Sequence, residues 1–142
     1  MALTAIICLA LSSCTQNNGH IGKLFGSWAL VAMDVDSEPY EPNCETYLSF
    51  QSNVAVFMHD TGNYEYANRV CTWSRHENII SFDFDHHDDK NPAGTDTYAP
   101  PEWLLLDDLK IAMTITRLDN GHLDMVYLNE GKSYTYKFER TW

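Results

Sequence analysis

The chain has 142 residues, which is the length of one domain with a substantial core. Its composition is typical of a globular protein, 44% hydrophobic and 20% charged, and its 13% aromatic share favours pleated β-structure. The formal net charge of -11 argues against a nucleic-acid partner, because phosphate binding needs a basic face. It also argues against adhesion to anionic lipid through a polybasic patch.

The N-terminus carries an apolar run over residues 2–11. It is too short for a membrane-spanning helix, which needs about 20 residues, but it suits the apolar core of a signal peptide. The run ends in Leu11-Ser12-Ser13-Cys14, which resembles the lipobox of bacterial lipoproteins. That resemblance implies cleavage before Cys14 and acylation of its thiol, although no Lys or Arg precedes the run. A buried N-terminal strand or helix is the alternative.

Residues 15–19 are polar, which favours a tether over a folded segment. We therefore expect residues 1–13 to be a lipoprotein signal peptide, 14–23 to be the lipidated Cys14 and its tether, and 24–142 to be the folded domain. Two or more acyl chains, palmitate among them, hold a protein stably in a bilayer. We expect a monomer in the bacterial cell envelope, lipid-anchored in the outer membrane.

From Gly26 onward, short alternating runs are separated by turn signals. Asn120-Gly121 and Glu130-Gly131 are strong hairpin signals, because Gly adopts positive φ without strain. Eight consecutive hairpin strands predict an all-β fold, an eight-stranded antiparallel up-and-down barrel. The predicted strands are Trp28–Val35, Thr46–Gln51, Val54–Met58, Tyr66–Trp73, Ile79–Phe84, Leu109–Leu118, Leu123–Tyr127 and Ser133–Arg140.

The chain has four cysteines, of which Cys8 lies in the predicted signal peptide and Cys14 is the predicted acylation site. Cys44 and Cys71 remain as an even pair, and in an oxidising compartment we predict that they form a disulfide. Two buried free thiols are the alternative. A zinc site is less favoured, because no His or Cys lies at metal-ligand spacing around either residue.

Four features over residues 24–142 resemble lipocalin-like domains of Bacteroidetes-type lipoproteins. They are Gly26-Ser27-Trp28, Cys44 followed by Tyr47-Leu48-Ser49-Phe50, Cys71-Thr72-Trp73 before an Ile-Ile-Ser-Phe strand, and the closing Gly131-Lys132-Ser133-Tyr134-Thr135-Tyr136-Lys137-Phe138. The resemblance implies a closed or nearly closed barrel. It also implies that Trp28 packs at the closed end, with Arg140 of the last strand stacked across it.

Residues Asp85 to Asp108 depart from the resemblance as a long insertion, and such loops are usually functional or disordered. Residues 103–106 are expected to form a helical turn after Pro100-Pro101, and the segment to fold over the barrel mouth. A polar cluster stands at its start, and a divalent-metal site there is less favoured than a solvated loop, so no metal is predicted. The cluster comprises Asp83, Asp85, His86, His87, Asp88 and Asp89.

The barrel is predicted to bind a small apolar or amphipathic ligand in its interior. A solid core is the alternative, because eight-stranded interiors can be filled by side chains. A second hypothesis is a structural or interaction lipoprotein that binds a protein or glycan partner through its surface or the 85–108 loop. An exposed patch at Trp103, Leu104 and Leu105 would support it. The predicted ligand-binding residues are Leu30, Phe50, Val56, Phe82, Met113, Tyr134, Tyr136 and Phe138.

No catalytic motif stands out. The sequence contains no Gly-x-Ser-x-Gly, no Gly-rich phosphate loop and no His-Glu-x-x-His. We therefore expect a binding or interaction protein without enzymatic activity or cofactor, whose partners are the membrane and a small apolar ligand.

Overall fold

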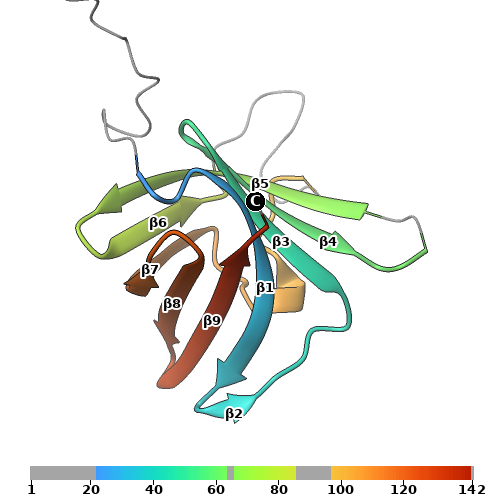
Figure 1. The fold of residues 1–142 in the computed structure, drawn as a ribbon. Coiled ribbons are helices and arrows are strands. Elements are labelled where there is room, and N and C mark those ends of the chain that lie inside the picture. Colours follow the sequence, from blue (N-terminus) through green and yellow to red (C-terminus); the bar gives the residue numbers. More distant parts are fainter. Residues whose placement is uncertain (1–21, 64–65, 86–96, 142) are drawn as a thin grey trace, which may run out of the picture.

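A computed structural model describes residues 22–63, 66–85 and 97–141 (Figure 1). Its strands are β1 (Gly26–Val35), β2 (Glu38–Pro39), β3 (Glu45–Gln51), β4 (Val54–Asp60), β5 (Tyr66–His76), β6 (Ile79–Asp83), β7 (Lys110–Leu118), β8 (His122–Asn129) and β9 (Lys132–Arg140). A short 3-10 helix, η1, spans Glu102–Leu104. In the described ranges, no helix has the length and apolarity needed to cross a membrane. The predicted signal peptide, Cys14 and residues His86 to Asp89 lie outside these ranges.

The strands form one antiparallel sheet that closes on itself. Its order is β2-β1-β3-β4-β5-β6-β7-β8-β9, and β1 also pairs with β9. The eight strands β1 and β3 to β9 therefore make a closed up-and-down barrel, which confirms the predicted fold class (Figure 1). Closure leaves none of these eight strands as a free sheet edge. β2 is an additional two-residue strand that the sequence did not reveal.

Several turns lie where the sequence predicts them. Glu130 and Gly131 connect β8 to β9 with φ values of 51° and 78°, the left-handed pair that a two-residue hairpin needs. Asp119 organises the β7–β8 turn, because its carboxylate accepts hydrogen bonds of 2.8 Å from the backbone N–H groups of both Gly121 and His122. An Asp that caps its own turn in this way stabilises the chain reversal.

Period-two alternation directs one face of each strand inward. In β9, Tyr136 and Phe138 are buried while Lys137 and Glu139 are exposed. Burial of a large apolar side chain contributes about 1.5–3 kcal/mol. The largest fully buried side chains are Trp28, Tyr136, Phe50, Phe57, Phe82, Phe84, Phe138, Leu24, Leu48, Ile80, Leu104 and Leu106.

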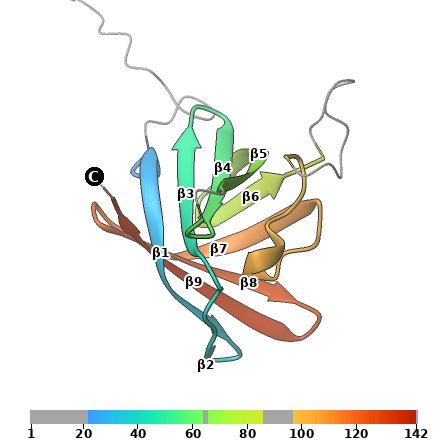
Figure 2. The ribbon, with the colours of Figure 1, turned by 90° about the vertical axis from the view of Figure 1, so that its right-hand side faces the viewer.

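The two ends of the barrel differ. At one end β1 begins and β9 ends, and Trp28 packs under the guanidinium of Arg140, as the resemblance implies. The indole Nε1 of Trp28 donates to the carbonyl of Leu24, which closes this end with the residues before β1. The other end is covered by the segment that carries η1 (orange), which Figure 2 shows crossing the opening beside β8.

Candidate functional site

The barrel interior is occupied by the protein's own side chains. Five of the eight residues predicted to bind a ligand are at most 2% exposed and belong to the hydrophobic core. They are Phe50, Phe82, Met113, Tyr136 and Phe138. Their rings pack on one another and on further core residues; the centroids of Phe50 and Trp73, for example, are 5.0 Å apart in an edge-to-face arrangement. At these five positions the side chains fill a solid core, as the alternative to a ligand cavity predicts.

The other three predicted residues lie elsewhere. Val56 follows the alternation of β4 in the opposite sense to the buried Ala55 and Phe57, so its place on the inner wall was predicted wrongly. Tyr134 is half-buried beside Tyr127, with ring centroids 5.8 Å apart. Leu30 is also half-buried, and it lines a groove described below.

Residues 97–108 plug the open end of the barrel. Leu104 and Leu106 are 0% and 1% exposed, so they complete the core from this side. The hydroxyl of Tyr136 donates to the carbonyl of Leu104 over 2.7 Å, and the hydroxyl of Tyr127 donates to Asp108. The predicted helical turn at residues 103–106 is found as the 3-10 helix at Glu102–Leu104, and residues 97–108, the described part of the predicted loop, cover this end of the barrel. Of the three residues whose exposure would support an interaction surface, Leu105 is 38% exposed, Trp103 is half-buried and Leu104 points into the core.

The plug is clasped from β4 and β5. The buried Arg69 guanidinium forms an ion pair with Glu102 at 3.1 Å and lies 5.3 Å from the centroid of the Trp103 ring. The ring of His59 packs on the same indole, with centroids 4.1 Å apart. Cation–π and ring contacts at such distances hold the segment against the barrel rim.

Cys44 and Cys71 are both free thiols, so the predicted disulfide is wrong. Cys71 of β5 pairs with Ala55 of β4, and Ala55 pairs with Phe50 of β3, so Cys71 lies at the same height on the barrel wall as Phe50. Cys44 precedes Phe50 by six residues. At about 3.3 Å per residue the two lie on the order of 20 Å apart along the barrel wall, whereas a disulfide needs Cα atoms within about 7 Å. Cys71 instead donates to the Ala55 carbonyl.

Burial perturbs several titratable groups inside the barrel. It raises the pKa of the Cys71 thiol, with the charge of Asp83 acting in the same direction. It also raises the pKa of the Tyr136 hydroxyl, and together with a hydrogen bond to Asp108 it raises the pKa of Tyr127 to about 12. All three groups are therefore neutral at pH 7, as their place in the wall of a packed core requires.

The predicted polar cluster is only partly described. Asp83 ends β6, and its carboxylate accepts a hydrogen bond from the backbone N–H of Asp85. His86, His87, Asp88 and Asp89 lie outside the described residues. Among the residues that the structure does describe, no group of three or more His, Cys, Asp or Glu is placed to hold a metal ion.

A hollow arises where β1 separates from β3. β1 pairs with β3 only from Gly26 to Ala29, and a bulge at Val31 then bends it along β9. The sheet register shifts at such a bulge, which re-aims the strand. Beyond it, a turn at Asp36 and Ser37 with φ of 50° and 67° reverses the chain into β2.

The chain then runs back alongside β1 towards β3. The N–H of Tyr40 donates to the carbonyl of Met33 over 2.9 Å, which holds this returning segment in place. Between the two lies a hollow of about 630 Å³, hereafter the β1 groove. It is lined by Leu30, Val31, Ala32, Met33, Asp34, Pro39, Tyr40, Glu41, Pro42, Cys44 and Glu45.

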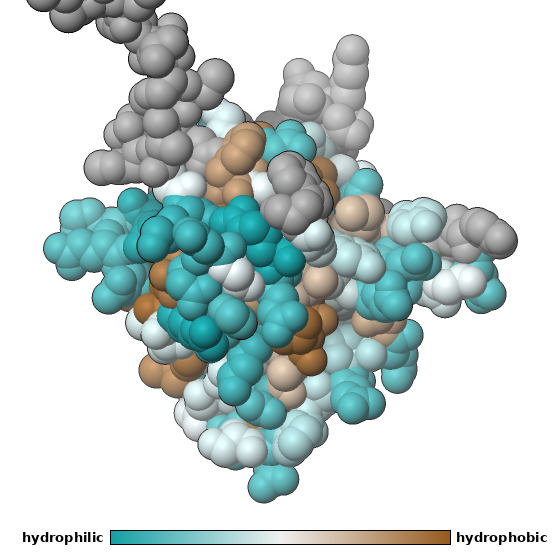
Figure 3. All heavy atoms as spheres, viewed as in Figure 1, coloured by the Kyte–Doolittle hydropathy of each residue, from teal (hydrophilic) through white to brown (hydrophobic). Residues whose placement is uncertain are grey.

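The β1 groove combines an apolar lining with negative charge. Apolar side chains of β1 and the ring of Tyr40 form much of its surface, and Figure 3 shows apolar residues over β1 bordered by hydrophilic ones. Its three charged residues, Asp34, Glu41 and Glu45, are all acidic. A hollow of this kind can bind a hydrocarbon group together with a positively charged one.

Sequence reasoning found only Leu30 of this groove. The available signals were Pro39 and Pro42, which exclude a regular central strand, and Asp36-Ser37, residues that favour turns. They predict an irregular crossing between the first two long strands. They do not predict that it packs beside β1, because that depends on the bulge and on the separation of β1 from β3.

Comparisons with known proteins identify the fold. No family model matches the chain, and no curated protein matches its sequence. A lipocalin-like protein from Bacteroides uniformis matches its structure with a TM-score of 0.58 at 15% identity, covering 84% of this chain and 99% of that one. An uncharacterized protein from Bacteroides eggerthii matches with a TM-score of 0.54 at 13% identity, covering 82% and 98%. Together with the closed eight-stranded barrel, these likenesses show that the chain has a lipocalin-like fold.

Proposed function

We propose that this protein is an exported, lipid-anchored barrel that binds a small amphipathic ligand, and that the ligand is held in the β1 groove and not in the barrel interior. The observation that carries the proposal is the groove of about 630 Å³ beside β1. This volume is within the range of about 300–1,000 Å³ typical of small-molecule sites. The core residues that fill the interior favour the outer position.

The chemistry of the groove favours a particular class of ligand. Asp34, Glu41 and Glu45 line it without any Lys or Arg, and its other residues are mainly apolar. A ligand with a short hydrocarbon portion and a cationic group matches both features, because it buries apolar surface while placing its charge near carboxylates. An anionic amphiphile of the same length would meet electrostatic repulsion.

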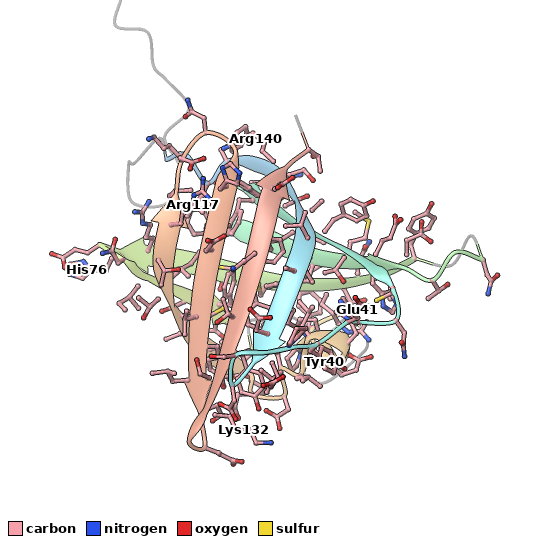
Figure 4. The ribbon with its side chains drawn as sticks, turned by 60° about the horizontal axis from the view of Figure 1, so that its bottom comes forward. Tyr40, Glu41, His76, Arg117, Lys132 and Arg140 are labelled. Carbon is pink, nitrogen blue, oxygen red and sulfur yellow. The ribbon has the colours of Figure 1, made fainter. Side chains whose placement is uncertain are left out.

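Lipid anchoring belongs to the same proposal and rests on the Leu11-Ser12-Ser13-Cys14 sequence. Gly22, the first described residue, lies at the closed end, where β1 begins. Tyr40 and Glu41 of the β1 groove lie towards the opposite end, near Lys132 (Figure 4). An anchor at Cys14 would therefore leave the groove directed away from the bilayer. Cys14→Ala is expected to release the protein from the membrane fraction, and unchanged fractionation would refute the anchor.

Calorimetric titration with octyltrimethylammonium, below its micellar concentration, tests the ligand site. Val31 lines the groove and is 54% exposed, so Val31→Arg adds bulk and positive charge there without disturbing the core. We expect binding to the wild-type protein and its loss in Val31→Arg. Leu128→Arg is the matched control, because Leu128 is 73% exposed on β8 and does not line the groove.

Two outcomes contradict the proposal. If octyltrimethylammonium still binds to Val31→Arg, the ligand site is not the β1 groove. If octyl sulfate binds equally well, the carboxylates do not select the ligand's charge. If the carboxylates act as proposed, Glu41→Gln combined with Glu45→Gln weakens binding of the cationic probe while leaving the fold intact, since both side chains are exposed, Glu41 after β2 and Glu45 at the start of β3.

A further inference from the structure

A second groove lies at the opposite end of the barrel and has the opposite charge. Its volume is about 500 Å³, and it is formed by the start of the described chain, the β5–β6 turn and the end of β7. Lys23, Arg75 and Arg117 line it, and no Asp or Glu does. Three of the nine Lys and Arg residues of a chain with net charge -11 thus meet in one hollow. We call it the basic groove; its other lining residues are Gly22, Asn78, Ile115, Thr116 and Leu118.

The cations of the basic groove keep free hydrogen-bond donors. Arg75 uses its Nε to donate to the carbonyl of Glu77, and Arg117 uses Nε on Asp119 and Nη2 on His122. Among the described residues, the Lys23 ammonium, both Nη groups of Arg75 and Nη1 of Arg117 have no hydrogen-bond partner. These donors suit an oxyanion, since Arg and Lys bind phosphate through several charge-assisted hydrogen bonds.

Asp119 is the carboxylate that contacts this cluster, at 3.0 Å from Arg117. Its Oδ1 accepts from the backbone N–H groups of Gly121 and His122 in the β7–β8 turn, while its Oδ2 pairs with Nε of Arg117 and offsets part of that charge. Arg140 adds a fourth cation at the same end, through its hydrogen bonds to the backbone carbonyls of Lys23 and Phe25. Figure 4 shows Arg117 and Arg140 together at this end, far from Glu41 and Tyr40.

The chain itself indicates what the groove faces. Gly22 lines the groove and lies eight residues after Cys14, so a fully extended connection reaches at most about 28 Å. If Cys14 is anchored, the basic groove lies at the end of the folded domain that the tether enters, because Gly22 and Lys23 line it. The acidic β1 groove then points away from the bilayer, which avoids repulsion by negative headgroups.

We infer that the basic groove binds the phosphate of an anionic lipid headgroup in the membrane that carries the anchor, and so orients the tethered barrel. The inference rests on the proposed anchoring for the identity of that membrane. Tethering raises the local headgroup concentration, so a shallow site of three cations is sufficient. Asp119 lies 3.0 Å from Arg117 at this end of the barrel, but no Asp or Glu lines the groove itself.

Vesicle co-sedimentation of the full chain carrying Cys14→Ala tests the inference without an acyl chain. Vesicles of phosphatidylglycerol mixed with phosphatidylcholine are compared with pure phosphatidylcholine, at about 20 mM salt so that screening is weak. We expect binding only to the vesicles that contain phosphatidylglycerol. Replacing two basic residues, Arg75→Gln with Arg117→Gln, should weaken that binding about thirty-fold.

The matched control is Lys110→Gln with Lys132→Gln, which changes the net charge equally at exposed positions outside the basic groove. It should leave vesicle binding within about twofold. An equal loss in both double variants shows that overall charge is responsible and overturns the inference. Absence of vesicle binding, or binding to both vesicle types alike, overturns it as well.

A titration with inorganic phosphate distinguishes a site for a free phosphate ion from a site for a lipid headgroup. If it shifts the backbone NMR signals of Asn78 and Thr116 while vesicles do not bind, the groove is a site for a free anion and the headgroup assignment fails. None of these outcomes bears on the β1 groove, which is tested by calorimetric titration with octyltrimethylammonium. Membrane fractionation of the protein with Cys14 intact reads the anchor separately, so failure of the headgroup inference is distinguishable from failure of the proposed function.

Discussion

The guanidinium carbon of Arg140 lies 4.2 Å from the centroid of the Trp28 ring, and the two residues are paired across the β1–β9 seam that closes the barrel. Arg140 also donates to the carbonyls of Phe25, Asn120 and Lys23. One side chain thus joins the first strand, the last strand, the residues before the barrel and the β7–β8 turn. This makes the closed end dependent on the planar geometry of a guanidinium group.

Arg140→Lys should destabilise the protein by about 2 kcal/mol in urea unfolding, because an ammonium keeps the charge but cannot reach three carbonyls and stack on an indole at once. Lys137→Ala, on the exposed face of the same strand, should change stability by at most about 0.5 kcal/mol. Equal effects of the two substitutions would show that Arg140 acts only as a surface charge.

Gly26→Ala should be more damaging than Gly131→Ala. Both glycines have positive φ, 118° and 78°, so each substitution carries backbone strain. A Cβ at Gly26 would also meet Arg140 Nη1 at 2.8 Å, whereas nothing lies within 4 Å of one at Gly131. We expect an additional loss of about 1 kcal/mol at Gly26, measured by urea unfolding. In the double variant with Arg140→Lys the excess should shrink.

Tyr136→Phe removes the 2.7 Å hydrogen bond to the Leu104 carbonyl inside the barrel. The carbonyl stays buried without its donor, so the protein should lose about 1–3 kcal/mol of stability. Hydrogen exchange of residues 101–108 should accelerate, because this contact ties the plug to β9. Tyr134→Phe, on the same face of β9, is the control and should leave exchange in the plug unchanged. Slow exchange of the plug in both variants would refute its dependence on Tyr136.

Stability should fall above pH 8.5, and Cys71 should account for part of the fall. Burial raises the pKa of its thiol, so the folded protein keeps a proton that the unfolded chain loses above about pH 8.5. The unfolded state then binds fewer protons, and the free energy of unfolding decreases with a slope approaching about 1.4 kcal/mol per pH unit. Cys71→Ala should flatten the profile between pH 8.5 and 10.5.

The two thiols should differ in reactivity. Cys44 is half-buried at the entry to β3 and should react with a water-soluble maleimide in the folded protein, whereas Cys71 is 2% exposed and should react only after unfolding. Peptide mapping under non-reducing conditions should recover both as unlinked peptides. A Cys44–Cys71 cross-linked peptide from folded protein would contradict the strand register of β3, β4 and β5.

Much of the barrel was predictable because strands and turns are specified by residues close together in the chain. Alternation along β9 and β7, and Gly131 after Glu130, report directly which side chains point inward and where the chain reverses. The stack of Arg140 on Trp28 followed from a resemblance and was confirmed by the closed seam. The ligand site could not be predicted in this way. The sequence pattern of an inward-facing residue such as Phe50 is the same whether its side chain lines a cavity or fills a core.

What the sequence determined by itself was the eight long strands of the barrel and most of their inner faces, because period-two alternation and turn chemistry act between near neighbours in the chain. Tertiary structure alone decided that Leu104 plugs the barrel, that Cys44 and Cys71 stand apart, and that Glu41 and Arg117 line grooves of opposite charge. Those relationships depend on the stagger of strands around a closed barrel and on a bulge at Val31, and neither is specified by any short stretch of residues.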